Sequence, residues 1–255
     1  MNSLFDVSGK IVLVTGGTSG IGEMIARGFI DAGAIVYISS RKADVGEKLA
    51  KELSETGPCT FIQANLNTEA ECRRLAEEMT QCEDHLDVLV NNAGATWGAP
   101  MGDYDEAAFE RVLSLNVKGV FHLTKFLRPL LSVGATSEEP SRVINIGSID
   151  GLKAPSMETY AYSSSKAAVH QLTRHLAKFF APTITVNAIA PGPFESRMMH
   201  ATIEAAGDQI VRSVPMHRLG KPSDMAGAAI FLSSPAATYI TGAILPVDGG
   251  AATVG

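Results

Sequence analysis

The sequence predicts a single α/β domain built on a doubly wound parallel β-sheet flanked by helices. Short apolar runs rich in β-branched residues alternate with helical patterns along most of the 255-residue chain. These runs are apolar on both faces, as strands buried between two helix layers must be. Hydrophobic residues make up 45% and charged residues 19% of the chain, which excludes intrinsic disorder. We therefore expect residues 1–255 to fold as one domain.

The elements follow in a regular order. The run at 11–14 ends in glycines and leads into a helical pattern at 21–32, and this alternation then repeats. Further strands are expected at 35–38, 60–63, 86–90, 142–146, 184–189 and 243–247, and further helices at 45–55, 69–81, 106–131, 161–180 and 222–232. The stretch from 191 to 215 opens on Pro-Gly-Pro and interrupts the alternation, so we expect it to be irregular.

Charge and cysteine content exclude several classes of function. The chain has 21 Lys and Arg against 27 Asp and Glu, a net charge of −6, which argues against nucleic acid and against a polybasic membrane anchor. Its three cysteines lack metal-site spacing, and we expect neither disulfides nor a metal site. No signal peptide or membrane-spanning run is recognisable, so we expect a cytoplasmic protein.

A glycine-rich turn, Thr-Gly-Gly-Thr-Ser-Gly-Ile-Gly, joins the first strand to its helix. Its glycines allow a tight turn and close approach of an anion, and the helix N-terminus then offers free N–H groups. In a βαβ unit this arrangement favours the pyrophosphate of a dinucleotide over a simple turn. The contacts expected here are Gly16, Thr18, Ser19, Gly20, Ile21 and Gly22.

The end of the second strand indicates which dinucleotide binds. Enzymes that use NAD place a carboxylate there for the ribose hydroxyl, whereas this strand ends with Ser40 and Arg41 and has no acid before Asp44. Because a guanidinium can bind a 2′-phosphate with two hydrogen bonds, we predict NADP(H). The alternative is that Arg41 and Lys42 are a solvated charge pair at the start of the next helix.

A tyrosine and a lysine lie four residues apart in the helix expected at 161–180. Residues at this spacing share a face, so the Lys166 ammonium is expected near the Tyr162 phenol. A cation about 4 Å away favours the phenolate by roughly 4 kcal/mol at a dielectric of ~20, or about three pKa units. The phenol is then expected to exchange protons near neutral pH. The alternative is two unrelated helix residues.

Three other features of the sequence add polar or small residues that are candidates for the same site. Ser148 follows the strand at 142–146, where parallel sheets bind ligands, and Asn92-Ala93-Gly94 follows the strand at 86–90. Asn116 interrupts the apolar stripe of the long helix, and a buried amide requires partners.

Together, the glycine turn, the Asn-Asn-Ala-Gly edge, Asn116, Ser148 and the Tyr162–Lys166 pair resemble the short-chain dehydrogenase/reductase family from Gly9 to Gly250. The resemblance implies a Rossmann fold and four catalytic residues. Tyr162 would transfer a proton to or from the substrate oxygen, and Ser148 would hydrogen-bond that oxygen. Lys166 would lower the pKa of the tyrosine and hold the nicotinamide ribose, and Asn116 would order a water of the proton relay.

The resemblance also implies further cofactor contacts. They are Asn65, Leu66, Asn92, Ala93, Gly94, Tyr162, Lys166, Pro191, Gly192 and Ser196. Two of them depart from the family pattern: Asn65 stands where the family usually has Asp, and Ser196 stands where it usually has Thr. A substrate lid is implied at about 193–215.

Within the family, the runs at 142–148 and 95–98 and the polar loop before residue 142 are most similar to 3-oxoacyl-(acyl-carrier-protein) reductases of the rhamnolipid-biosynthesis type. This implies NADPH-dependent reduction of a 3-oxoacyl thioester to the 3-hydroxyacyl form, with an acyl carrier protein as a possible partner and a homotetramer as the assembly. Two alternatives remain open, an enzyme for a small ketone, sugar or alcohol, and a non-enzymatic NADP-binding sensor or scaffold.

Overall fold

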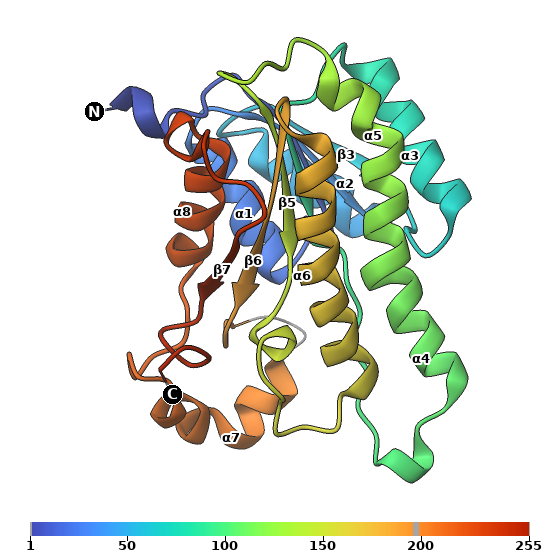
Figure 1. The fold of residues 1–255 in the computed structure, drawn as a ribbon, viewed down its shortest axis with the longest axis vertical. Coiled ribbons are helices and arrows are strands. Elements are labelled where there is room, and N and C mark those ends of the chain that lie inside the picture. The colour runs from blue at the N-terminus through green and yellow to red at the C-terminus, as the bar shows by residue number, and fades with distance from the viewer. Residues whose placement is uncertain (1, 196–198, 255) are drawn as a thin grey trace.

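Seven parallel strands form one sheet at the centre of the molecule (Figure 1). The structure is a computed structural model, and it describes residues 2–195 and 199–254. The strand order is β3-β2-β1-β4-β5-β6-β7. The strands are β1 (Ile11–Thr15), β2 (Ile35–Ser40), β3 (Cys59–Gln63), β4 (Val88–Asn91), β5 (Ser141–Ile146), β6 (Ile184–Pro191) and β7 (Ile244–Val247). The predicted doubly wound α/β fold is confirmed.

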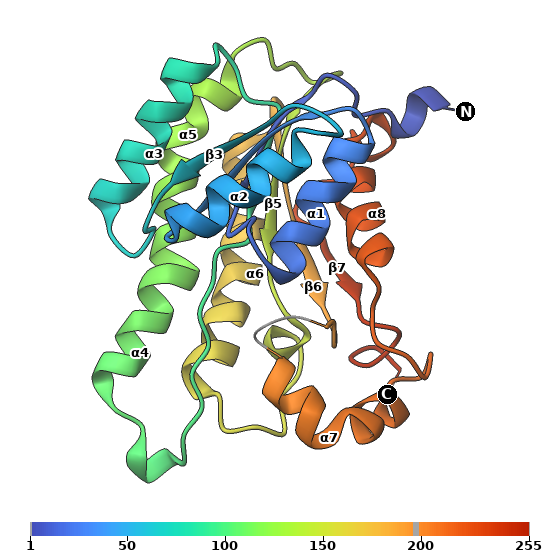
Figure 2. The same ribbon diagram turned by 180° about the vertical axis from the view of Figure 1, so that it is seen from behind.

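Helices cover both faces of the sheet, as Figures 1 and 2 show from opposite sides. They are α1 (Gly20–Asp31), α2 (Ala43–Leu53), α3 (Glu69–Cys82), α4 (Glu106–Leu113), α5 (Val120–Ser132), α6 (Tyr160–Phe180), α7 (His200–Ser213) and α8 (Pro222–Ser233). One core lies between the sheet and α1, α2 and α8, and contains Phe29 and Met225. The other lies between the sheet and α3, α5 and α6, and contains Leu75 and Leu127. This division explains why the central strands are apolar on both faces.

The direction of the chain reverses at the centre of the sheet. After β1 the chain builds β2 and β3 outward on one side, then returns to place β4 on the other side of β1. Val14 therefore pairs with Ile38 of β2 and with Val90 of β4. The connections diverge at such a reversal, which leaves a crevice at the carboxyl ends of the strands where doubly wound sheets bind ligands.

Two predictions of secondary structure were wrong. The helix expected at 106–131 is divided by a π-helical segment, Ser114–Gly119, between α4 and α5. The stretch from 191 to 215 is not irregular throughout, because α7 occupies fourteen of its residues. No proline lies between Pro193 and Pro215, so nothing in the chain prevents a helix from forming there.

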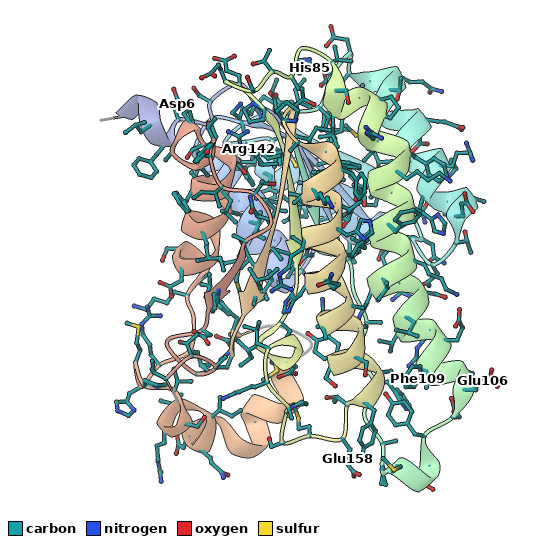
Figure 3. The ribbon with its side chains drawn as sticks, viewed as in Figure 1. Asp6, His85, Glu106, Phe109, Arg142 and Glu158 are labelled. Atoms are coloured by element: carbon teal, nitrogen blue, oxygen red, sulfur yellow. The ribbon has the colours of Figure 1, made fainter. Side chains whose placement is uncertain are left out.

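The carboxyl ends of the strands point toward the lower end of the molecule in Figure 1, where α7 lies. Figure 3 places Glu158, before α6, and Phe109, in α4, at this end, whereas Arg142 at the start of β5 and His85 lie at the other. Among the residues that the structure describes, no helix is long and apolar enough to cross a membrane.

Candidate active site

The glycine-rich turn forms a close junction between β1, α1 and the end of β4. Gly16 and Gly20 have positive φ angles of 63° and 54°, which side chains other than glycine rarely adopt. A Cβ on Gly16 would lie 2.9 Å from Asn92 Nδ2, and one on Gly22 would overlap both that atom and the Gly16 carbonyl oxygen. Ser19, the N-cap of α1, makes no side-chain capping bond. The first N–H groups of α1 are therefore left for another acceptor.

Thr15 and Asn92 fasten this junction, a role that the sequence did not reveal. The Thr15 hydroxyl donates to the Val90 carbonyl (3.2 Å) and accepts from the Asn92 and Ala93 N–H groups (both 3.0 Å). Asn92 Nδ2 donates to the carbonyls of Thr15 (2.8 Å) and Gly16 (3.1 Å). The Asn92 side chain thus holds the turn, and Ala93 and Gly94 follow it along the same edge.

The ends of β2 and β3 form the neighbouring part of this edge. Arg41 is exposed, and its carbonyl accepts a hydrogen bond of 3.0 Å from Gln63 Nε2 at the end of β3. A cleft of about 740 Å³ runs along β3 and α3 and includes Arg41 and Asn65 in its lining. The Asn65 amide oxygen accepts from Asn67 Nδ2 (3.0 Å), which leaves one lone pair for a further donor. Leu66, the next residue, is buried.

Asn116 is buried in the π-helical segment between α4 and α5. Its Nδ2 donates to the Ala95 carbonyl and to Ser165 Oγ, both at 2.9 Å, and its Oδ1 accepts from the Ala95 N–H at 2.8 Å. The widened turn places the amide between the loop after β4 and α6, where a regular helix would give it another direction. These bonds connect the π-helical segment with the loop after β4 and with α6, so Asn116 joins three elements around the site.

Tyr162 and Lys166 lie on the first two turns of α6. Lys166 is buried, and its Nζ donates to the Ile146 carbonyl at the end of β5 (2.7 Å). This Nζ lies 5.5 Å from the centre of the Tyr162 ring. A Cβ on Gly94 would lie 3.8 Å from Lys166 Nζ and 3.3 Å from Asn116 Oδ1. The ammonium, the amide and the edge after β4 therefore converge on one space, and Lys166 lies near Tyr162, as the spacing of these two residues predicted.

Ser148 completes this group from the other side. It is buried directly after β5, and its hydroxyl accepts from the Asp150 N–H at 3.1 Å, which caps the single helical turn Ile149–Gly151. A hydrogen bond between Ser148 and the Tyr162 phenol favours the phenolate. The structure thus brings the hydroxyl, the phenol and the ammonium together.

The acidity of Tyr162 differs from the sequence-based expectation. The pKa of Tyr162 is raised to about 12, chiefly by burial; the hydrogen bond with Ser148 partly opposes this rise, and the charge on Asp150 adds to it. Burial also lowers the pKa of Lys166 to about 8, against a smaller opposing effect of Asp150. Desolvation penalises both charged forms, and the Lys166 ammonium is directed to Ile146 as well as lying near the ring. The fall that we expected in the pKa of Tyr162 was therefore wrong.

The remaining sequence candidates also lie at the carboxyl edge. Pro191 ends β6, and the Gly192 N–H donates to the Val247 carbonyl at the end of β7 (3.0 Å). A Cβ on Gly192 would lie 2.7 Å from Asp248 Cα, so glycine is required for this close packing. Ser196 lies outside the described residues.

Comparisons with known proteins agree with this arrangement. Residues 16–252 match a family described as enoyl-(acyl carrier protein) reductase. The chain is 47% identical to a rhamnolipids biosynthesis 3-oxoacyl-[acyl-carrier-protein] reductase of Pseudomonas aeruginosa, over 98% of this chain and 99% of the relative. It is 36% identical to an L-tagatose-forming galactitol 2-dehydrogenase of Cereibacter sphaeroides, over 97% of each chain.

A solved structure gives the same picture. The Pseudomonas aeruginosa RhlG/NADP active-site complex superposes with a TM-score of 0.95 at 46% identity, covering 99% of this chain and 100% of the other. The glycine turn, the Ser148–Tyr162–Lys166 group and these matches over nearly the whole chain lead to one assignment. The protein is an oxidoreductase that belongs to the short-chain dehydrogenase/reductase family.

Proposed function

We propose that this protein is an NADPH-dependent reductase that converts a ketone to a secondary alcohol, with a 3-oxoacyl thioester as its substrate. The observation that carries the proposal is the convergence of Ser148, Tyr162 and Lys166 beside Gly94 at the carboxyl edge of the sheet. The relative with 47% identity, a 3-oxoacyl-[acyl-carrier-protein] reductase, supports the choice of substrate.

The residues of the edge fit NADP(H). The tight junction at Gly16 and Gly22, with the uncapped start of α1, suits a pyrophosphate bound by Gly16 and residues 18–22. Arg41 and Ser40 at the end of β2 suit a 2′-phosphate, since the chain has no acidic residue between Arg41 and Asp44. The RhlG/NADP complex is a close structural match, which supports the same cofactor. Further contacts are proposed at the positions Asn65, Leu66, Asn92, Ala93, Gly94, Pro191, Gly192 and Ser196.

The proposed chemistry divides between cofactor and protein. When bound, NADPH supplies a hydride to the carbonyl carbon. Ser148 donates a hydrogen bond to the carbonyl oxygen and stabilises the charge that develops there. Tyr162 gives its proton to the same oxygen. Lys166 and Asn116 position the Tyr162 phenol and help to return a proton to it. A pKa of about 12 keeps the Tyr162 phenol protonated at neutral pH, which suits the role of proton donor in reduction.

Exposed apolar side chains on the loops of this end of the molecule support a substrate with an acyl chain. The loops are joined by hydrogen bonds from the Ala99 N–H to the Glu158 carbonyl (3.2 Å) and from Lys153 Nζ to the Ala251 carbonyl. The apolar side chains are Trp97, Met101, Leu152, Met157, Met216 and Val254. Such a surface favours an alkyl chain over a fully hydroxylated sugar.

Several finer features belong to the same proposal. Residues 193–215 would form the substrate lid, because α7 lies beyond the carboxyl edge of the sheet (Figure 1). An acyl carrier protein would present the substrate, the active form would be a homotetramer, and the protein would work in the cytoplasm. Sedimentation that shows only monomer at micromolar concentration would contradict the tetramer.

The test is a substrate panel with NADPH. We expect turnover of acetoacetyl thioesters, carried by acyl carrier protein or coenzyme A, and loss of that turnover in Tyr162→Phe with NADPH binding retained. Activity on small ketones or sugars with none on thioesters would favour the alternative represented by the galactitol dehydrogenase relative. Binding of NADPH with no turnover of any carbonyl would favour the sensor or scaffold alternative.

A further inference from the structure

His170 is a buried histidine of α6 that the proposed chemistry leaves without a role. It lies one turn after Lys166, and only 3% of its surface is exposed. Neither ring nitrogen makes a hydrogen bond of ordinary geometry with any residue that the structure describes. Unpaired buried nitrogens destabilise a fold, so hydrogen bonding does not explain a histidine at this position.

The imidazole ring packs against the backbone on both sides of Ser148. A Cβ on Gly147, directly before Ser148, would overlap His170 Nε2 and lie 2.7 Å from His170 Cδ2. A Cβ on Gly151, three residues after Ser148, would lie 2.8 Å from His170 Cε1. The Gly147 N–H also donates to the Ile189 carbonyl of β6 at 2.7 Å. Gly147 is therefore held between β6 on one side and the histidine ring on the other.

The turn that carries Ser148 rests on α6 in two different ways. At its far end, a Cβ on Gly151 would lie 2.7 Å from the Lys166 carbonyl carbon and 2.8 Å from the Ala167 nitrogen, so Gly151 touches the helix backbone directly. At its near end, Gly147 meets the side chain of His170 instead. The width of this ring therefore separates one end of the turn from the helix and determines how the turn is tilted.

The ring is uncharged at neutral pH. Burial lowers the pKa of His170 to about 4; a contact with the Gly151 backbone partly opposes this fall, and the charges on Lys166 and Arg174 add to it. A neutral ring can lie one turn from the Lys166 ammonium without repelling it. What His170 contributes is thus the size and flat shape of its side chain.

We infer that His170 is a positioning residue, whose imidazole spaces Gly147 from α6 and so fixes the place of the Ser148 hydroxyl in the candidate active site. The inference rests on the proposed function, in which this hydroxyl hydrogen-bonds the carbonyl oxygen of the substrate. A displacement of about 1 Å at a reacting group can reduce a rate by about 100-fold. Since an imidazole ring is wider than that, removing it would allow Ser148 to move far enough to impair turnover.

The test is a double-mutant cycle between His170→Ala and Ser148→Ala, with kcat and KM measured for NADPH and acetoacetyl-N-acetylcysteamine. His170→Gln retains a flat end group of similar reach and tests for rescue. His175→Ala is the matched control, because His175 lies on the same helix but is exposed and stacks on Phe179. Urea unfolding of every variant checks that it is folded.

We expect His170→Ala to lower kcat by about 10- to 100-fold with KM and NADPH binding nearly unchanged, since the bond from Ser148 strengthens as charge develops on the oxygen. Ser148→Ala should retain about one hundredth to one thousandth of kcat. In that background, His170→Ala should cause no further loss, because the ring acts through the missing hydroxyl. His170→Gln should restore most of kcat, and His175→Ala should match the wild type.

Two results would overturn the inference alone. One is full kcat in folded His170→Ala. The other is an equal loss with and without the Ser148 hydroxyl, which would show that the ring acts elsewhere, for example through the Ile146 carbonyl that binds Lys166. If His170→Ala does not fold, His170→Asn, one methylene shorter than His170→Gln, replaces it in the cycle.

Failure of the proposed function has a different signature. Full activity of Ser148→Ala would contradict the proposed role of Ser148, and the inference about His170 would fall with it. A wild type that reduces ethyl acetoacetate but no thioester would contradict only the acyl substrate. The same cycle, run with that ester, would then decide the role of His170.

Discussion

The buried Lys166 is expected to reduce the stability of the protein. Burial lowers the pKa of this amine from 10.5 to about 8. The charged form of the amine is therefore less stable in the folded protein than in water. One pKa unit corresponds to about 1.4 kcal/mol, and the shift therefore amounts to roughly 3 kcal/mol of destabilisation at pH 7. Replacement by Met preserves the apolar stem without the charge. It also removes the hydrogen bond to the Ile146 carbonyl, at a cost of about 1–2 kcal/mol.

The sign of the pH dependence follows from the two pKa values. Below pH 8 the amine is protonated in both the folded and unfolded chain, and the penalty is fully present. Between about pH 8 and 10.5 the folded protein has released this proton while the unfolded chain retains it, so the free energy of unfolding rises with pH. Lys166→Met has no such group. The stability of the wild type relative to this variant should therefore increase by about 2 kcal/mol between pH 7 and 9.5.

The assay is urea unfolding of both proteins at pH 7 and 9.5, at one protein concentration. We expect Lys166→Met to be inactive yet more stable than the wild type by about 1 kcal/mol at pH 7. Lys48→Met is the control, because Lys48 is exposed on α2 and should change neither value. A wild-type advantage at pH 7, or a difference that stays constant across this pH range, would refute the reasoning.

Three further predictions concern the cofactor edge and the frame of the site. Arg41→Ala should lower kcat/KM with NADPH by about 10- to 100-fold and leave that with NADH unchanged, because charged hydrogen bonds to a phosphate contribute about 1.5–3 kcal/mol; equal losses with both cofactors would contradict its role. Gly22→Ala should abolish NADPH binding measured by fluorescence, since its Cβ would overlap the turn, whereas Gly227→Ala, which meets no atom within 4 Å, should bind normally. Asn116→Ala should reduce the free energy of unfolding by about 1–3 kcal/mol, since it leaves the partly buried N–H and carbonyl groups of Ala95 without partners, and a loss below about 0.5 kcal/mol would show that water replaces the amide.

Local features of the chain were sufficient to predict most of the fold and to select the candidate residues of the site. Doubly apolar strands and helical periodicity determine which segments alternate, and parallel strands place their carboxyl ends at one edge. The glycine turn before α1, Ser148 after β5 and the Tyr162–Lys166 spacing could be recognised for this reason. Each of them depends on residues only a few positions apart.

Only the tertiary structure determined the burial, the hydrogen-bond partners and the neighbouring charges of these groups. The fall expected in the pKa of Tyr162 was wrong because its burial depends on segments far away in the sequence. In the π-helical turn, the Asn116 amide is hydrogen-bonded to partners 21 and 49 residues away, and no local sequence pattern predicts this turn. Gly151 lies against the backbone of Lys166 because a turn after β5 packs on α6. Periodicity and spacing are properties of the chain itself, whereas desolvation and charge–charge effects depend on distances that only packing establishes.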